Sequence, residues 1–256
     1  MLHILAICDI NSPKGKIINQ QLLDLGVSFE IIPAVFPSEP YPQSPLYHEK
    51  KRMQLNGYPM VKGEIGCFLA HREAWKATLS GSHDYVLIIE DDIKITRENL
   101  PKITSITDIK EAQNFITLLF VANHQLSFRR WIKHQDVQLV IPTKKAYSTM
   151  AYFISKQTAA RLLKHSESIF CPVDEFTNME SLHHIPLAHC YPLLVEQDGS
   201  TSSIGLRTKP PIKTLQKLIR NYFRFTSEIK EKIVRLKTRV RLGLLGAKVE
   251  THHLHS

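Results

Sequence analysis

The chain has no apolar run of the roughly 20 residues that a membrane-spanning helix needs. Its first apolar stretch, residues 2–10, is short and precedes the nearest lysines, whereas a secretory signal carries its positive charges first. The four cysteines form neither a CxxC pair nor a zinc-finger spacing. We therefore expect reduced thiols in the cytosol, and we interpret residues 2–10 as a first core strand.

The excess of positive charge is confined to one end of the chain. Counting Lys, Arg, Asp and Glu gives residues 1–206 a net charge of −1 and residues 207–256 a net charge of +10. A length of 256 residues with 43% hydrophobic residues suits one large α/β domain with an appendage. The sequence thus predicts a neutral domain over 1–206 and a basic helical tail over 207–256. A negatively charged partner is expected to bind the tail.

Hydrophobic periodicity predicts alternating strands and helices in the first part of the chain. Residues 2–10, 16–26 and 27–36 have the patterns of a strand, a helix and a strand. This βαβ opening favours an α/β fold, a parallel sheet with helices on both faces. The later predictions are a long loop with one short helix at 37–62, a helix at 63–80, strands at 83–93 and 115–123, a strand and helix within 146–165, and a strand and polar loop at 186–205.

Three adjacent carboxylates, Glu90, Asp91 and Asp92, follow the apolar run of residues 85–89. Ligands of open α/β sheets bind outside the carboxyl ends of the strands, where this triplet is expected to lie. Ionised carboxylates this close repel one another unless a cation neutralises them, and their oxygens suit Mg²⁺ or Mn²⁺. The triplet therefore predicts a metal–diphosphate site, with a solvated acidic turn as the alternative.

The block over residues 63–95 resembles the signature of glycosyltransferase family 25, the lipopolysaccharide and lipooligosaccharide glycosyltransferases of Gram-negative bacteria. The matching residues, in the order and spacing of the family, are Gly63, Glu64, Gly66, Cys67, His71, Trp75, Glu90, Asp91 and Asp92. Segments 151–155, 171–174 and 195–204 are similar to later family elements. The chain departs from the family at Ala70, where Ser is usual, and at residues 8–16, which lack the usual Arg-rich run.

The resemblance implies a GT-A type fold in which Glu90 and Asp92 form a D-x-D-like motif for a UDP-sugar and a divalent cation. Asp92 is expected to bind Mn²⁺ or Mg²⁺ with support from Asp91, and Glu90 to contact the ribose or a metal-bound water. His71 has two interpretations, a contact to the donor phosphate or the triplet, and a core histidine. Gln197 is a candidate donor contact on a polar loop, together with Ser202.

The expected reaction is an inverting transfer of a hexose, for which one base near the acceptor hydroxyl is enough. Asp174 is the first candidate for this base and Glu175 the second, although Asp174 could instead cap a helix after Pro172. The resemblance favours galactose from UDP-galactose, with glucose or an N-acetylhexosamine as alternatives. The expected acceptor is a lipid-linked oligosaccharide of the lipooligosaccharide or lipopolysaccharide type.

Residues 211–241 combine apolar residues at helical spacing with many Lys and Arg, which predicts one or two basic amphipathic helices. Such helices commonly lie on anionic membranes, so we expect a peripheral protein on the cytoplasmic face of the bacterial inner membrane. In the alternative, part of the apolar stripe packs on the domain or on a partner helix, and the two arrangements can coexist.

Two other function classes compete with this interpretation. A nucleic-acid-binding protein could use the basic tail, but the domain is neutral and carries no recognised nucleic-acid motif. A phosphoryl-transfer domain also places Asp pairs at strand ends, but the chain lacks a P-loop. We therefore expect no nucleic-acid partner.

Overall fold

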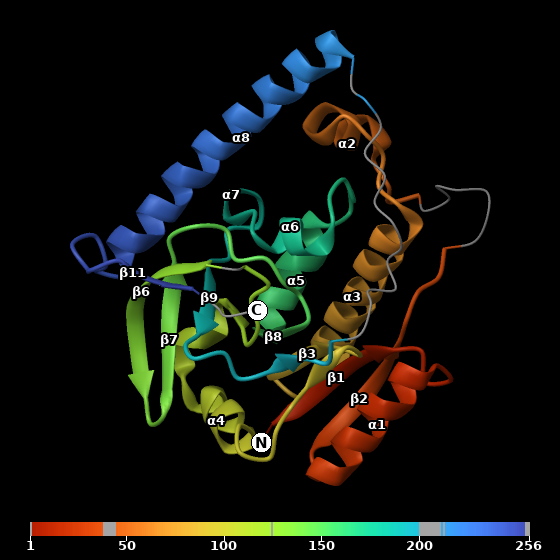
Figure 1. The fold of residues 1–256 in the computed structure, drawn as a ribbon, viewed down its shortest axis with the longest axis vertical. Coiled ribbons are helices and arrows are strands. Elements are labelled where there is room, and N and C mark those ends of the chain that lie inside the picture. The colour runs from red at the N-terminus through yellow and green to blue at the C-terminus, as the bar shows by residue number, and fades with distance from the viewer. Residues whose placement is uncertain (1, 38–44, 124, 200–210, 212, 254–256) are drawn as a thin grey trace.

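A computed structural model describes residues 2–37, 45–123, 125–199, 211 and 213–253. A nine-stranded mixed sheet runs through the molecule with helices on both faces. A long C-terminal helix lies along one side of the molecule (Figure 1). The predicted α/β fold class is confirmed. The predicted domain boundary near residue 206 and the candidate Ser202 lie outside the described residues.

The strands of the large sheet are, in spatial order, β11 (Glu250–His253), β6 (Gln125–His134), β7 (Val137–Pro142), β9 (Leu187–Cys190), β5 (Ile116–Leu118), β8 (Ala151–Ser155), β3 (Tyr85–Glu90), β1 (His3–Cys8) and β2 (Ser28–Pro33). A separate two-stranded sheet pairs β4 (Ile93–Lys94) with β10 (Glu196–Gln197).

The helices are α1 (Pro13–Leu25), α2 (Glu49–Asn56), α3 (Lys62–Ser80), α4 (Leu100–Ser105), α5 (Lys156–His165), α6 (Val173–Thr177), α7 (Glu180–His183) and α8 (Thr214–Arg241), with short 3₁₀ turns η1 (Ile106–Asp108) and η2 (Lys110–Asn114). The short helix expected within residues 37–62 is α2, and Ser155 caps the start of α5.

Two hydrophobic clusters cover the two faces of the sheet. Helices α3, α5 and α6 pack on one face, and α1 and α4 pack on the other. Strand β3 contributes to both, because Val86 and Ile88 point to the α3 side and the alternate residues point to the α1 side. Glu90 continues the alternation of Val86 and Ile88, so the strand directs its carboxylate toward α3.

The sheet is mixed, so the expected parallel arrangement is right for only part of it. Strand β1 pairs in parallel with β2 and β3, as the βαβ opening predicts, but β8 lies antiparallel between β3 and β5. The chain reaches β8 through the β6–β7 hairpin, which the sequence did not reveal. Its turn contains no Gly or Pro, and Gln135 adopts the left-handed conformation with φ 50.

The tail forms one helix, α8, followed by a return to the sheet. Strand β11 pairs antiparallel with β6, and Leu244 joins a small buried cluster with Phe115 and Ile141. Among the described residues, no helix has the length and apolar character required to span a bilayer.

Candidate active site

Two cavities meet at the carboxyl ends of β1 and β3. The first has a volume of about 730 Å³ and lies between the start of α1 and the first turns of α3. The second, of about 260 Å³, lies between α3, the 147–150 segment and the start of α6. Cys67, Glu90 and Asp92 line both cavities, so the acidic triplet stands at the boundary between them.

Close backbone contacts at two glycines shape the walls of the first cavity. A Cβ atom on Gly66 would lie 2.2 Å from the carbonyl oxygen of Val35, and one on Gly15 would lie 1.9 Å from the carbonyl oxygen of Asp9. Both distances are far below van der Waals contact, so only glycine permits these approaches. Gly66 thereby fixes α3 against the segment after β2, and Gly15 fixes α1 against the end of β1.

The start of α1 contributes polar groups that sequence reasoning did not identify. Ser12 caps the helix by accepting a hydrogen bond from the Gly15 amide at 2.9 Å, and Lys14 follows in the first turn, which contains no acidic residue. Both residues line the first cavity. A helix N-terminus and a lysine favour a negatively charged ligand. The Ser-Pro-Lys sequence after a strand was the available signal for this feature.

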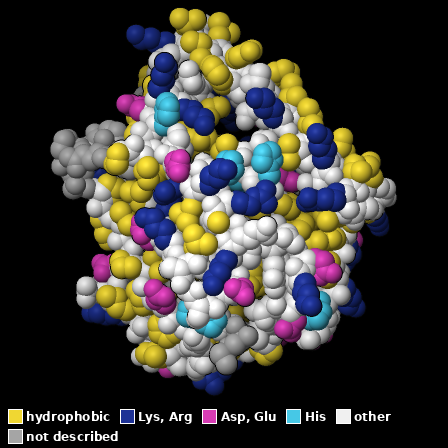
Figure 2. All heavy atoms as spheres, turned by 180° about the vertical axis from the view of Figure 1, so that it is seen from behind, with side chains coloured by type: hydrophobic (Ala, Val, Ile, Leu, Met, Phe, Trp, Pro, Cys, Tyr) yellow, Lys and Arg dark blue, Asp and Glu magenta, His cyan; other side chains and the backbone are white. Residues whose placement is uncertain are grey.

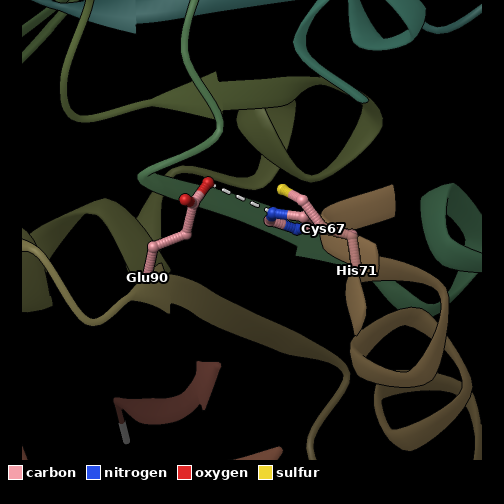
Figure 3. Close-up of side chains that lie close together, drawn as sticks. All are labelled: Cys67, His71 and Glu90. Atoms are coloured by element: carbon pink, nitrogen blue, oxygen red, sulfur yellow. Dashed lines mark hydrogen bonds and ion pairs between the residues drawn. The ribbon is translucent and has the colours of Figure 1, made fainter. Parts of the chain in front are cut away.

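His71 holds Glu90 through a chain of buried side chains. The Trp75 indole donates to the Tyr152 hydroxyl at 2.9 Å, and this hydroxyl lies 2.8 Å from Nδ1 of His71. Nε2 of His71 lies 3.2 Å from Oε1 of Glu90 (Figure 3). The consistent assignment has the Tyr152 hydroxyl donating to Nδ1 and Nε2–H donating to the carboxylate. His71 is therefore a buried residue of α3 that also orients the triplet.

The three carboxylates of the triplet have different environments. Burial alone would raise the pKa of Glu90, but hydrogen bonds from His71 and Thr149 lower it below its ordinary value. Burial raises the pKa of Asp91, and it raises the pKa of Asp92 to about 6, with the charge of Glu90 adding to the rise. Glu90 is thus held as the anion, while Asp92 carries an unfavourable charge at neutral pH.

Asp92 also has an unsatisfied atom. Its Oδ1 is buried and accepts no hydrogen bond from the part of the chain that the structure describes. A buried carboxylate oxygen without a donor is costly, and a bound cation would remove that cost. The donor set of carboxylate oxygens from Asp91 and Asp92 fits Mg²⁺ or Mn²⁺.

A second possible ligand group overlaps the triplet. Ligand atoms of Cys67, His71 and Glu90 lie within 4.8 Å of one another (Figure 3). A thiol and an imidazole suit a softer ion such as zinc, and Nε2 of His71 is already engaged with Glu90. The two aspartates are therefore the better candidates for a hard cation.

The two candidates for the base have separate positions. Asp174 lines the second cavity, and its Oδ1 accepts the Glu175 amide at 2.9 Å in the first turn of α6. Glu175 lines neither cavity. Its carboxylate lies 3.9 Å from the Arg52 guanidinium, and burial raises its pKa. Gln197 lines the second cavity from β10. The structure thus brings Asp174 and Gln197 to the triplet and separates Glu175 from it.

Residues 11–177 match glycosyltransferase family 25 (LPS biosynthesis protein), more than half of the chain. The chain belongs to glycosyltransferase family 25. The resemblance stated from residues 63–95 is confirmed, and so is the enzyme class at the level of the family.

The similar curated proteins include one named for galactose transfer and others named only for the family. Procollagen galactosyltransferase 2 of Homo sapiens is 30% identical over 121 residues, which are 46% of this chain and 19% of that protein. A glycosyltransferase 25 family member of Aedes aegypti is 27% identical over 161 residues, 62% of this chain and 23% of that protein. The human inactive glycosyltransferase 25 family member 3 is 26% identical over 124 residues, 47% and 21% of the two chains.

The chain spans about one fifth of the length of these curated relatives, at 19%, 23% and 21%. Among solved structures, it is similar to a glycosyltransferase involved in the glycosylation of the major capsid of PBCV-1, with 14% identity and a TM-score of 0.37 over 73% of this chain and 81% of the other.

Proposed function

We propose that this protein is a metal-dependent, inverting glycosyltransferase that moves galactose from UDP-galactose to a lipid-linked oligosaccharide. The observation that carries the proposal is the position of the triplet at the boundary of two cavities, with Oδ1 of Asp92 buried and unsatisfied by the described residues. A reaction between two substrates needs its reactive centre where both binding sites meet.

The first cavity is the proposed donor site. Its volume of about 730 Å³ suits a nucleotide sugar, since ligand pockets commonly measure about 300–1,000 Å³. The diphosphate would lie between Lys14, at the start of α1, and the acidic triplet. There the lysine and the bound cation would offset its negative charge. Asp91 and Asp92 would hold the divalent cation, which spreads the negative charge that develops on the leaving diphosphate.

The second cavity is the proposed acceptor site. The acceptor hydroxyl would attack the anomeric carbon from the side opposite the leaving group, forming the new glycosidic bond as the sugar–phosphate bond breaks. Its proton would pass to Asp174, and the bonding electrons would leave with UDP. Glu90, held by His71 and Thr149, would keep the donor side of the centre in place.

The substrate assignment has its own support. Galactose is favoured because the matched relatives include procollagen galactosyltransferases, with glucose and an N-acetylhexosamine as the alternatives. The family description supports a lipopolysaccharide-type acceptor, and such an acceptor favours a site on the cytoplasmic face of the bacterial inner membrane.

A donor screen tests the proposed reaction. UDP-galactose, UDP-glucose and UDP-N-acetylhexosamines would be incubated with the protein and a lipooligosaccharide acceptor, with Mn²⁺, Mg²⁺ or EDTA. We expect transfer of galactose with Mn²⁺ or Mg²⁺ and none with EDTA. Undiminished transfer in EDTA would exclude the metal role, and transfer of another sugar would reassign the donor.

A further inference from the structure

The C-terminal half of helix α8 contacts α7 through polar side chains, and its N-terminal half lies beside α2. The Glu231 carboxylate accepts the backbone amides of Glu180 and Ser181 at 3.1 and 2.9 Å, at the start of α7. Arg235 lies 2.8 Å from this carboxylate, and Thr238 donates to the side chain of Glu180. Glu231 and Thr238 are the only buried residues among those described in α8. Polar interactions therefore fix the C-terminal half of this helix to the body.

The apolar stripe of α8 faces away from that contact. Its large side chains are between 40% and 69% exposed, and they are Leu215, Leu218, Ile219, Tyr222, Phe225, Ile229, Ile233, Leu236 and Val240. Ile233 and Val240 each follow a buried residue of the docked face by two positions, which is about 200° around a helix. The alternative that part of the stripe packs on the domain holds for Phe223, which is half-buried and shares a hollow with Leu55 of α2. It does not hold for the nine exposed side chains.

Basic residues border the stripe on both sides. Lys230, Lys232, Lys237 and Arg241 lie beside it by helical spacing, and Figure 2 shows dark blue side chains beside hydrophobic ones along the upper right edge. Of the two acidic residues in α8, Glu231 is buried in the contact with α7. The exposed face of α8 is therefore apolar along its centre and positive along its borders.

We propose that this face of α8 lies in the interface of an anionic membrane, with its axis parallel to the bilayer plane. From Leu215 to Val240 the stripe extends for about 38 Å, and its arc covers about 120°, which is the form of an interfacial amphipathic helix. Acidic headgroups complement the basic borders. A second copy of α8 would instead bring these positive borders against one another.

The docking contact also links the membrane face to the proposed acceptor site. The Arg235 guanidinium donates to the backbone carbonyl of Asn178 at 2.9 Å, and the side-chain amide of Asn178 donates to the backbone carbonyl of Asp174 at 2.9 Å. The helix that would lie on the membrane is thus anchored beside the candidate base. This part of the inference rests on the proposed function, because it assigns the lipid-linked acceptor to the surface on which α8 lies.

Vesicle co-sedimentation with the full chain tests the proposal. Vesicles of phosphatidylglycerol and phosphatidylethanolamine would be compared with vesicles of phosphatidylcholine, at about 0.1 M salt and at higher salt, where screening is stronger. We expect binding to the anionic vesicles that weakens with salt. Leu218→Glu with Phe225→Glu should weaken it at least about tenfold, because two apolar side chains no longer enter the interface.

A matched control separates burial from charge. Ile17→Glu with Leu23→Glu adds the same two negative charges at exposed apolar positions of α1, and it should retain most of the vesicle binding. Equal loss in both variants, or no binding by the wild type, would overturn the proposal. The proposal would also be overturned if the wild type formed a dimer in sedimentation velocity and bound no vesicles, while the α8 double variant was a monomer.

Galactose transfer to a soluble acceptor, measured on the same variants, distinguishes this inference from the proposed reaction. We expect the α8 double variant to keep this transfer while it loses vesicle binding. A protein that binds vesicles but transfers no sugar would overturn the reaction and leave the membrane face supported.

Discussion

Replacing Asp92 with Asn should make the protein more stable in the absence of divalent cations. Burial raises the pKa of Asp92 to about 6, against an ordinary value of 3.8, and its Oδ1 is unsatisfied by the described residues. This difference corresponds to about 3 kcal/mol, and solvent screening of the partly exposed carboxylate reduces it to about 1–2 kcal/mol. The melting temperature of the variant should rise by a few degrees.

The pH dependence of this effect has a definite sign. A carboxylate with a raised folded-state pKa destabilises the fold above that pKa, where it must carry its charge, and costs nothing below its ordinary value. The advantage of Asp92→Asn should therefore be full above about pH 6 and should disappear as the pH falls toward 3.8.

Thermal unfolding in EDTA and in Mn²⁺, between about pH 4.5 and 8, checks both statements. Mn²⁺ should stabilise the wild type, because it binds the folded state, and should leave Asp92→Asn almost unchanged. Asp136→Asn, in the exposed turn of the β6–β7 hairpin, removes the same charge and should have little effect in either condition. A variant that is less stable in EDTA at pH 7.5, or one stabilised by Mn²⁺ as strongly as the wild type, would refute the reasoning.

Three further changes test other parts of the site. Gly66→Ala should destabilise the fold by about 1–3 kcal/mol in urea unfolding, because its Cβ would lie 2.2 Å from a backbone carbonyl. Asp174→Asn should lower transfer by about 10²–10⁴-fold while donor binding in calorimetry is retained, whereas Glu175→Gln should lower it much less. His71→Ala should lower kcat about tenfold or more and move the acid limb of the pH–rate profile to higher pH. The reason is that the variant loses the hydrogen bond that lowers the pKa of Glu90.

Each of these changes has a control or a contradicting result. Gly246→Ala meets nothing within 4 Å and should leave stability nearly unchanged, so equal loss at both glycines would contradict the close-approach argument. Equal loss of transfer in the Asp174 and Glu175 variants would remove the distinction between them. An unshifted pH profile in the His71 variant would reduce that residue to a packing role.

The sequence predicted the elements with strong local patterns. The apolar run before Glu90 identified β3, and the spacing of hydrophobic residues identified α3. The hairpin turn at Gln135 carried no Gly or Pro, so β6 and β7 had no usual turn signal. Strand β11 is a short polar edge strand that exists because it pairs with β6.

The site was predictable where its residues adjoin in sequence. The triplet is one run of residues, whereas the position of Lys14 in the first cavity depends on how α1 packs. The sequence does not show which of Asp174 and Glu175 faces the site. The fold shows it, because Glu175 pairs with Arg52 while Asp174 lines the second cavity. Because Leu244 and β11 belong to the body, point substitutions in α8 are sharper tests of the tail than its deletion.

Calorimetric titration of UDP into the protein, with Mn²⁺ or with EDTA, measures the link between the acidic triplet and the donor diphosphate. The account predicts tight binding to the wild type with Mn²⁺, binding at least about tenfold weaker in EDTA, and weak binding to Asp92→Asn in both conditions. Equal affinity of the wild type and the variant, unaffected by Mn²⁺, would contradict the account.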